Sequence, residues 1–231
     1  MSSPSDSAPT DPLPTDLADQ VADILRAHLP AGAPGADTIE ELAAFCAALA
    51  ATNQHINLTG VTDPQGMALR HVLDSLTVSP LLQSAASLMD LGSGGGLPGI
   101  PLAIAHPELT VTLVESRERK AAALAELVES LGLSPRVTAV HARGEKWLAE
   151  HEVDIVVARA VDQTARLLKT LRPVREQFGR LILMKGPKAD EELATVKPRL
   201  ASLGFRYPEV HEAALPEEAG RRVLLVFDEA G

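Results

Sequence analysis

A glycine-rich stretch from Leu88 to Pro101, LMDLGSGGGLPGIP, constrains the fold of this chain more than any other feature. It reads as a short buried strand, then a glycine turn, then the start of a helix. Glycine adopts the positive φ that a tight turn requires, and its missing side chain lets a ligand approach the backbone. Asp90 stands at the carboxyl end of the strand, where open α/β sheets bind their ligands. The stretch predicts an α/β fold with a ligand site here; a connector without a ligand is the alternative.

Two classes of ligand fit these glycines. Residues 94–99 match G-x-G-x-x-G, which is typical of dinucleotide-binding enzymes. Gly92, Gly94 and Gly96 also match the G-x-G-x-G turn of S-adenosylmethionine methyltransferases, and an acid such as Asp90 before the turn favours that class. An NAD(P)-dependent Rossmann oxidoreductase and a module that binds S-adenosylmethionine or RNA without catalysis stay open as alternatives.

The composition is that of a globular protein, with 231 residues of which 45% are hydrophobic. Cys46 is the only cysteine, which excludes a disulfide within the chain and favours a reducing compartment. The chain shows no signal-peptide pattern and no apolar run of about 18 residues. We therefore expect a cytoplasmic protein without a membrane segment.

Charge is unevenly distributed along the chain. The formal net charge is -10, which taken alone argues against a nucleic-acid partner. Residues 1–64, however, hold nine acidic residues and one basic residue, whereas residues 159–188 hold eight basic residues and two acidic ones. The net charge of the whole chain therefore says little about the charge of any one site.

The chain divides into three expected parts. Residues 1–14 are rich in Ser, Pro, Asp and Thr and predict a disordered tail. Residues 15–85 predict a helical extension, and residues 86–231 a domain in which strands and helices alternate as in a parallel sheet.

Three helices are expected in the extension. The first starts after Thr15 or Asp16, and the second starts at a capping box formed by Thr38 and Glu41. The third starts at Asp63, followed by proline at the first helical position.

The domain ends in a way that separates fold classes. Two strand-like runs, 206–214 and 221–228, follow each other with no helix between them, so we expect an antiparallel hairpin at the sheet edge. A seven-stranded sheet that ends in such a hairpin is the class I methyltransferase architecture. The other expected strands are 88–91, 110–115, 137–141, 154–158 and 180–185.

Several polar residues lie where these strands end. Glu115 is the last residue of the strand that comes after the glycine turn, and its carboxylate could accept both hydroxyls of a ribose; a surface acid is the alternative. Gly144 and Glu145 follow the third strand, where methyltransferases hold the adenine, and Arg159 ends the fourth, which faces the methyl group. The histidines show no metal-ligand spacing with Cys or Asp, so we expect no metal.

At these residues the chain resembles a known family. Asn57-Leu58-Thr59, Arg70-His71 with Asp74-Ser75-Leu76, and the whole run 90–101 are similar to the bacterial small-subunit ribosomal RNA guanine-N7 methyltransferase G family, also called glucose-inhibited division protein B. The similarity continues through 115–120, Ala158-Arg159-Ala160 and Met184-Lys185-Gly186, and covers about residues 40–228.

The resemblance implies a class I fold and a reaction. S-adenosylmethionine would be the methyl donor, and N7 of a guanine in the 530 loop of 16S rRNA the acceptor, in the free RNA or the small ribosomal subunit. By motif position, the cofactor contacts fall on Gly92, Leu97, Gly144, Glu145 and Arg159. Gly144 stands where the pattern leads us to expect a side chain, so its contact would come from the backbone.

The resemblance also changes how the polar helix after Asp63 is interpreted. Spacing alone favours a surface ion pair between Arg70 and Asp74. The resemblance instead makes Arg70 and His71 candidates for the RNA or cofactor face, and Arg159 and His71 candidates for catalysis.

A second basic strip is expected to contact RNA phosphates. Arg166, Lys169 and Arg172 recur at a spacing of three and cover one side of a helix after Arg159; a solvated helix face is the alternative. With Lys185 and Lys188 they would form a phosphate-contacting rim on a protein that we expect to be a monomer.

Overall fold

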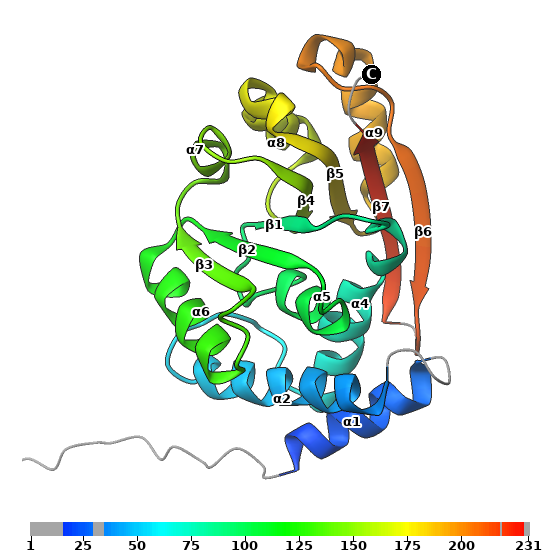
Figure 1. The fold of residues 1–231 in the computed structure, drawn as a ribbon. Helices are drawn as coiled ribbons and strands as arrows, with labels where there is room; N and C mark the ends of the chain where they lie inside the picture. Colours follow the sequence, from blue (N-terminus) through cyan, green and yellow to red (C-terminus); the bar gives the residue numbers. More distant parts are fainter. Residues whose placement is uncertain (1–15, 30–34, 218, 229–231) are drawn as a thin grey trace, which may run out of the picture.

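The computed structural model describes residues 16–29, 35–217 and 219–228. Its centre is a seven-stranded sheet with the order β3-β2-β1-β4-β5-β7-β6 (Figure 1). The strands from β1 to β5 pair in parallel, whereas β7 is antiparallel to both β5 and β6. The expected sheet and its terminal hairpin are confirmed. The strands are β1 (Ser87–Leu91), β2 (Thr110–Glu115), β3 (Val137–His141), β4 (Val153–Arg159), β5 (Phe178–Lys185), β6 (Glu209–Leu215) and β7 (Gly220–Asp228).

Helices cover both faces of this sheet (Figure 1). The α-helices are α1 (Leu17–His28), α2 (Ala36–Asn53), α3 (Pro64–Gly66), α4 (Asp74–Leu76), α5 (Gly99–Ala105), α6 (Glu118–Ser130), α7 (Gly144–Leu148), α8 (Thr164–Leu171) and α9 (Ala189–Val196). The other helical turns are η1 (Met67–Leu73), η2 (Ser79–Leu81), η3 (Arg172–Gln177), η4 (Lys197–Arg199) and η5 (Ala201–Leu203).

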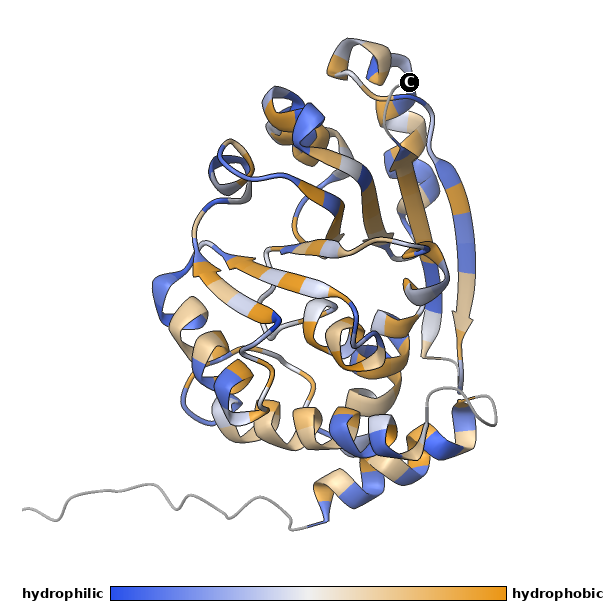
Figure 2. Ribbon diagram, viewed as in Figure 1, coloured by the Kyte–Doolittle hydropathy of each residue, from blue (hydrophilic) through white to orange (hydrophobic). Residues whose placement is uncertain are grey.

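Two hydrophobic cores form, one on each face, because successive strand side chains point to opposite sides. Leu88 of β1 belongs to the core beneath α1, α2, α5 and α6, whereas its neighbour Met89 belongs to the core beneath α8 and α9. Figure 2 shows β7 as largely hydrophobic beside an alternating β6, as expected for an inner strand beside an edge strand. None of the described helices is long and apolar enough to cross a membrane.

The helical extension shares the first of these cores. α1 packs on α2, and α2 packs on α5 and α6. Cys46 is fully buried within α2, and burial raises the pKa of its thiol to about 12, so it packs as a small apolar residue. The division between extension and domain at residue 85 stays a prediction, and the predicted tail 1–14 lies outside the described residues.

Two expected boundaries are wrong by three residues. The capping box at Thr38 does not form: Gly35 is the N-cap and α2 begins at Ala36, so Thr38 lies inside the first turn. The last hairpin's first strand begins at Glu209 rather than at residue 206, directly after Pro208, whose nitrogen cannot donate to a strand partner.

The third expected helix is continuous but changes its winding. Asp63 caps it as predicted, with Oδ1 accepting the Gly66 N–H at 2.7 Å. Residues 67–73 then follow a π-helical path, a rare geometry that recurs at functional sites. The α-helical path resumes at Asp74, and Ser75 Oγ donates to the His71 carbonyl oxygen at 2.6 Å.

Candidate active site

The glycine turn after β1 depends on its glycines in different ways. Gly92, Gly94 and Gly96 have φ of 72°, 56° and 80°, a region that disfavours residues with a side chain. A Cβ at Gly96 would lie 2.4 Å from Ile100 Cδ1, whereas one at Gly94 would meet nothing closer than the Gly92 carbonyl oxygen at 3.9 Å. Close packing therefore excludes a side chain at position 96, whereas a side chain at position 94 would point into open space.

Asp90 lies fully buried behind this turn. Its Oδ2 accepts the Gly99 N–H at 2.8 Å, and its Oδ1 has no hydrogen-bond partner among the described residues. Burial raises the pKa of the Asp90 carboxyl to about 7, although the Gly99 N–H and the charge of Arg159 act in the opposite direction. A buried carboxylate oxygen without a partner is costly, so this atom is suited to a cationic ligand group.

Glu115 closes the other side of the turn, at the end of β2. One carboxylate oxygen accepts the Gly94 N–H at 3.2 Å and the other the Arg117 N–H at 2.8 Å. The Ser116 hydroxyl also donates to Oε1 at 3.4 Å. A carboxylate offers about four acceptor positions, so Oε2, which accepts one hydrogen bond, keeps capacity for a ribose hydroxyl. Leu97 is buried within the turn.

A cavity of about 250 Å³ lies beside Glu115, at the carboxyl ends of β1 to β4. Gly92, Gly144 and Glu145 line it. The structure explains why Gly144 stands where a side chain was expected. A Cβ there would lie 2.0 Å from Leu91 Cδ1, so the close approach of Leu91 requires glycine. The cavity, Glu115 and the buried, unpartnered Asp90 oxygen fit the adenine, the ribose and the charged end of S-adenosylmethionine, respectively.

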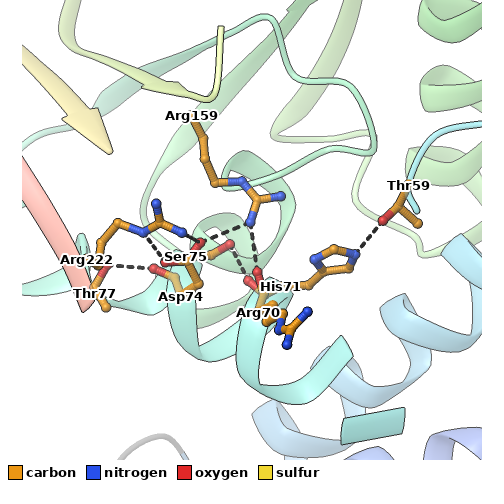
Figure 3. A network of polar contacts seen from close by, with 8 residues as sticks. All are labelled: Thr59, Arg70, His71, Asp74, Ser75, Thr77, Arg159 and Arg222. Carbon is orange, nitrogen blue, oxygen red and sulfur yellow. Dashed lines mark hydrogen bonds and ion pairs between the residues drawn. The ribbon is translucent and has the colours of Figure 1, made fainter. Parts of the chain in front are cut away.

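A buried ion network joins the extension to two strands of the sheet (Figure 3). Asp74 of α4 is completely buried. Arg159, at the end of β4, places Nη1 3.1 Å from Asp74 Oδ2 and 2.9 Å from the Arg70 carbonyl oxygen. Arg222 of β7 reaches the same carboxylate, with Nη2 2.7 Å from Oδ2.

This network corrects the expected surface pair. Asp74 bonds to Arg159 and Arg222, and Arg70 contributes its carbonyl oxygen while its side chain stays exposed. Arg222 was not expected to take part. No local sequence signal marks it, because its partner lies on an element far away in the chain.

His71 is buried in the π-helical segment. Its Nε2 lies 2.7 Å from Thr59 Oγ1, and burial together with the Arg159 charge lowers the pKa of His71 to about 4 (Figure 3). The ring is therefore neutral near pH 7. The structure does not place His71 on an exposed RNA face.

Comparison with known proteins decides between the classes that the sequence left open. A family model described as rRNA small subunit methyltransferase G matches residues 38–219. A protein named Ribosomal RNA small subunit methyltransferase G from Sorangium cellulosum is 43% identical over 166 residues, which cover 69% of each chain. One of the same name from Solibacter usitatus is 35% identical and covers 88% of this chain and 97% of its own. The chain belongs to the rRNA small subunit methyltransferase G family.

Solved structures show the same fold at low identity. The METTL16 MTase domain has a TM-score of 0.58 at 16% identity and covers 94% of both chains. M. capricolum TrmK in complex with S-adenosyl-homocysteine has a TM-score of 0.52 at 10% identity and covers 67% of both. The expected class I methyltransferase fold is thus confirmed for this member of the methyltransferase G family.

The structure separates the basic residues that the sequence grouped into one RNA-contacting rim. Arg166, Lys169, Arg172 and Lys188 are exposed, and Arg166 lies 3.7 Å from Asp162. Lys185 is instead buried, because its Nζ bonds to Glu192 at 2.9 Å and to the Asp162 carbonyl oxygen at 2.8 Å. It ties β5 to α9 and does not stand on an exposed rim.

No group of His, Cys, Asp and Glu side chains among the described residues could hold a metal ion.

Proposed function

We propose that this chain transfers a methyl group from S-adenosylmethionine to N7 of a guanine in the 530 loop of 16S rRNA. The observation that carries the proposal is the meeting of Asp90, Glu115 and Arg159 at one edge of the sheet, in a chain of the methyltransferase G family. We further propose that it acts as a monomer in the cytoplasm, on the RNA or on the small ribosomal subunit.

Five groups of this chain would hold the methyl donor. Asp90, whose Oδ1 has no partner, would stabilise its cationic end, Glu115 would accept a hydrogen bond from its ribose, and Gly92, Gly144 and Glu145, which line the cavity, would surround its adenine. When bound, S-adenosylmethionine supplies a methyl group on a positively charged sulfur, and the transfer leaves a neutral thioether and a positive charge on the guanine.

No residue has to act as a base in this reaction. Guanine N7 carries a lone pair and no proton, so it can attack without first losing one. This agrees with a His71 whose pKa lies near 4, a value too low for an effective base near neutral pH. The chain's contribution is positioning, which supplies several kcal/mol when the reacting atoms are held in line.

Arg159 is the residue that we propose to orient the reactants. Its Nη1 is fixed by Asp74 and by the Arg70 carbonyl oxygen, and its charge also acts on Asp90. A cation aimed at the guanine ring would oppose the charge that develops there. Arg159 therefore fits a role in holding the cofactor carboxylate or the guanine O6.

The exposed bases Arg70, Arg166, Lys169, Arg172 and Lys188 are proposed to contact RNA phosphates. Their exposure supports this role, and α8, which carries two of them, also lines the cofactor cavity through Thr170 and Leu171. An RNA strand placed over the cavity would thus meet these bases.

Two measurements test the proposal in order. S-adenosylmethionine at 100 times its dissociation constant should stabilise the chain by about 2.7 kcal/mol, whereas NADH should not; the reverse result would favour an oxidoreductase. Radiolabelled methyl transfer is then measured on 16S rRNA and on small subunits that lack this methyl group. If S-adenosylmethionine binds but neither substrate incorporates the labelled methyl group, the result would favour a non-catalytic binding module.

A further inference from the structure

A second cavity, of about 520 Å³, lies between the loop after α2 and the start of α6. It is lined by His55, Ile56, Asn57, Arg117, Glu118, Arg119 and Lys120. Arg117, Arg119 and Lys120 form no ion pair with any described residue, and Glu118 is the only acid on the cavity wall. In a chain with a net charge of -10, three unpaired bases around one hollow are a departure from the average surface.

This basic cavity borders the cofactor cavity. Ser116 lines the cofactor cavity and Arg117, the next residue, lines the basic one. Between β2 and β3, the Ala142 N–H donates to the Glu115 carbonyl oxygen at 3.1 Å, so Arg143 on the cofactor cavity wall lies at the neighbouring strand end. Arg143 is a fourth base without an ion-pair partner among the described residues. The two cavities therefore adjoin each other at residues 116–117.

The loop that forms the other wall leads to the buried ion network. Asn53 fixes this loop, because its Oδ1 accepts the N–H groups of Leu58 at 2.7 Å and Thr59 at 2.9 Å. Thr59 bonds to His71, which adjoins Arg70, and the Arg70 carbonyl oxygen holds Arg159. The basic cavity is thus connected by one short, hydrogen-bonded loop to the residues around the methyl-transfer point.

We propose that this cavity binds phosphates of the substrate RNA on the side of the sheet opposite to α8. The proposal rests on the proposed function, and it adds a contact surface that Arg166, Lys169 and Arg172 do not supply. Unpaired Arg and Lys side chains lining a hollow match a chain of phosphates, which carries one charge per nucleotide and whose binding releases counterions. An RNA held by both surfaces would lie across the cofactor cavity between them.

The test reverses charge in the cavity without weakening the helix that carries it. Arg119 and Lys120 lie in the first turn of α6, where acidic residues are favourable, so Arg119→Glu/Lys120→Glu should fold and keep its response to S-adenosylmethionine. The matched control is Lys197→Glu/Arg199→Glu, which changes the charge equally on η4, the turn that follows α9 between β5 and β6. Arg119→Gln/Lys120→Gln provides a second cavity variant.

Binding of unmethylated 16S rRNA is measured across a salt series, with methyl transfer followed separately. We expect the Glu variant to bind at least ~10-fold more weakly, with the salt slope reduced by about 1 for each phosphate that the variant no longer binds. The Gln variant should fall between it and the wild type, and the control should stay within about twofold of the wild type. Cavity variants that bind as the control does, or a wild type that binds no RNA, would overturn the proposal. If the cavity variants weaken RNA binding but the wild type transfers no methyl group, the result contradicts only the proposed function, and the RNA-binding proposal stands.

Discussion

Asp74 and Arg222 are 148 residues apart in the chain and form a two-pronged ion pair, with Arg222 Nη2 2.7 Å from Asp74 Oδ2. The Asp74 side chain is fully buried, so solvent does not weaken the pair as it does on a surface. Arg159 shares the same carboxylate at 3.1 Å. One residue of the helical extension therefore fixes the orientation of an arginine at the end of β4.

Replacing Arg222 should affect both stability and turnover. Arg222→Ala leaves a buried carboxylate with Arg159 as its remaining charged partner, so the loss of stability should be smaller than the about 3–5 kcal/mol expected when a buried charge loses its sole partner. Arg159 would then be drawn further toward Asp74, which should lower kcat more than it changes the KM for S-adenosylmethionine. Urea unfolding and steady-state kinetics, measured well below the melting temperature, check the two effects.

The conservative variant Arg222→Lys distinguishes a role of Arg222 in positioning Arg159 from a role in the stability of the fold alone. Arg222→Lys keeps the charge and should recover part of the kcat lost in Arg222→Ala. If Arg222→Ala lowers stability but leaves kcat per folded molecule unchanged, the pair only supports the fold.

Asp90 should make both folding and cofactor binding depend on pH. Its folded pKa of about 7 lies above the ordinary value of 3.8, so the folded state holds a proton that the unfolded state has released between these two values. The contribution of Asp90 to the free energy of unfolding therefore falls as pH rises from about 4 to 7, and it changes no further above pH 7. The groups that act on it are Arg159, which lowers its pKa, and Glu115, which raises it.

The matching variant is Asp90→Asn. It should melt at a higher temperature than the wild type at pH 8 without ligand, and lose most of its affinity for S-adenosylmethionine. In the wild type, that affinity should fall as the pH is lowered through 7, because a cation favours the ionised carboxyl. Calorimetric binding at several pH values checks this; an affinity independent of pH in the wild type would contradict the assigned contact.

The glycine turn should tolerate substitution at one position and not at another. Gly96→Ala forces a Cβ against Ile100 at 2.4 Å in a backbone of φ 80°, so it should destabilise the fold. Gly94→Asp meets open space and costs about 1–2 kcal/mol of backbone strain, but it puts a negative charge beside Glu115. It should fold by circular dichroism and lose S-adenosylmethionine binding, and an unchanged affinity would remove the turn from the site.

The elements that sequence reasoning located best are those set by local signals. The β2 and β3 bounds were predicted to the residue because hydrophobic alternation ends there in polar turns. Asp90 and Glu115 could be placed together because the carboxyl ends of neighbouring parallel strands meet at one edge. Their burial and hydrogen bonds could not be read from the chain.

What the sequence did not reveal depends on partners distant in the chain. Asp74 looked like a surface partner of Arg70 because spacing on one helix is the only relation that a sequence displays. Lys185 was expected to be exposed at the end of its strand, yet its Nζ lies 2.9 Å from a carboxylate oxygen of Glu192 in α9 and the side chain is buried. Burial of a charged side chain follows from tertiary pairing, which leaves no periodic signal.

The exposed bases of α8 and the start of η3 should contribute to RNA binding. Lys169→Glu/Arg172→Glu should weaken 16S rRNA binding and reduce its salt slope by about 1 for each phosphate no longer bound. The binding of S-adenosylmethionine serves as the control, because neither side chain lines the cofactor cavity. If both the affinity and the slope match those of the wild type, α8 does not face the RNA.

The pH dependence of the chemical step tests whether a base takes part. His71 has a pKa of about 4 and is neutral throughout the range between about pH 6.5 and 8.5, so its protonation state cannot change the rate there. With S-adenosylmethionine and RNA saturating, the single-turnover rate should be nearly flat over this range, and Arg159→Ala should lower it strongly without introducing a slope. A tenfold rise per pH unit in the wild type would instead reveal a catalytic base, and His71→Gln would be the first variant to examine. If His71→Gln removed that rise and kept a folded protein, His71 would be the base, and the mechanism based on positioning alone would be wrong.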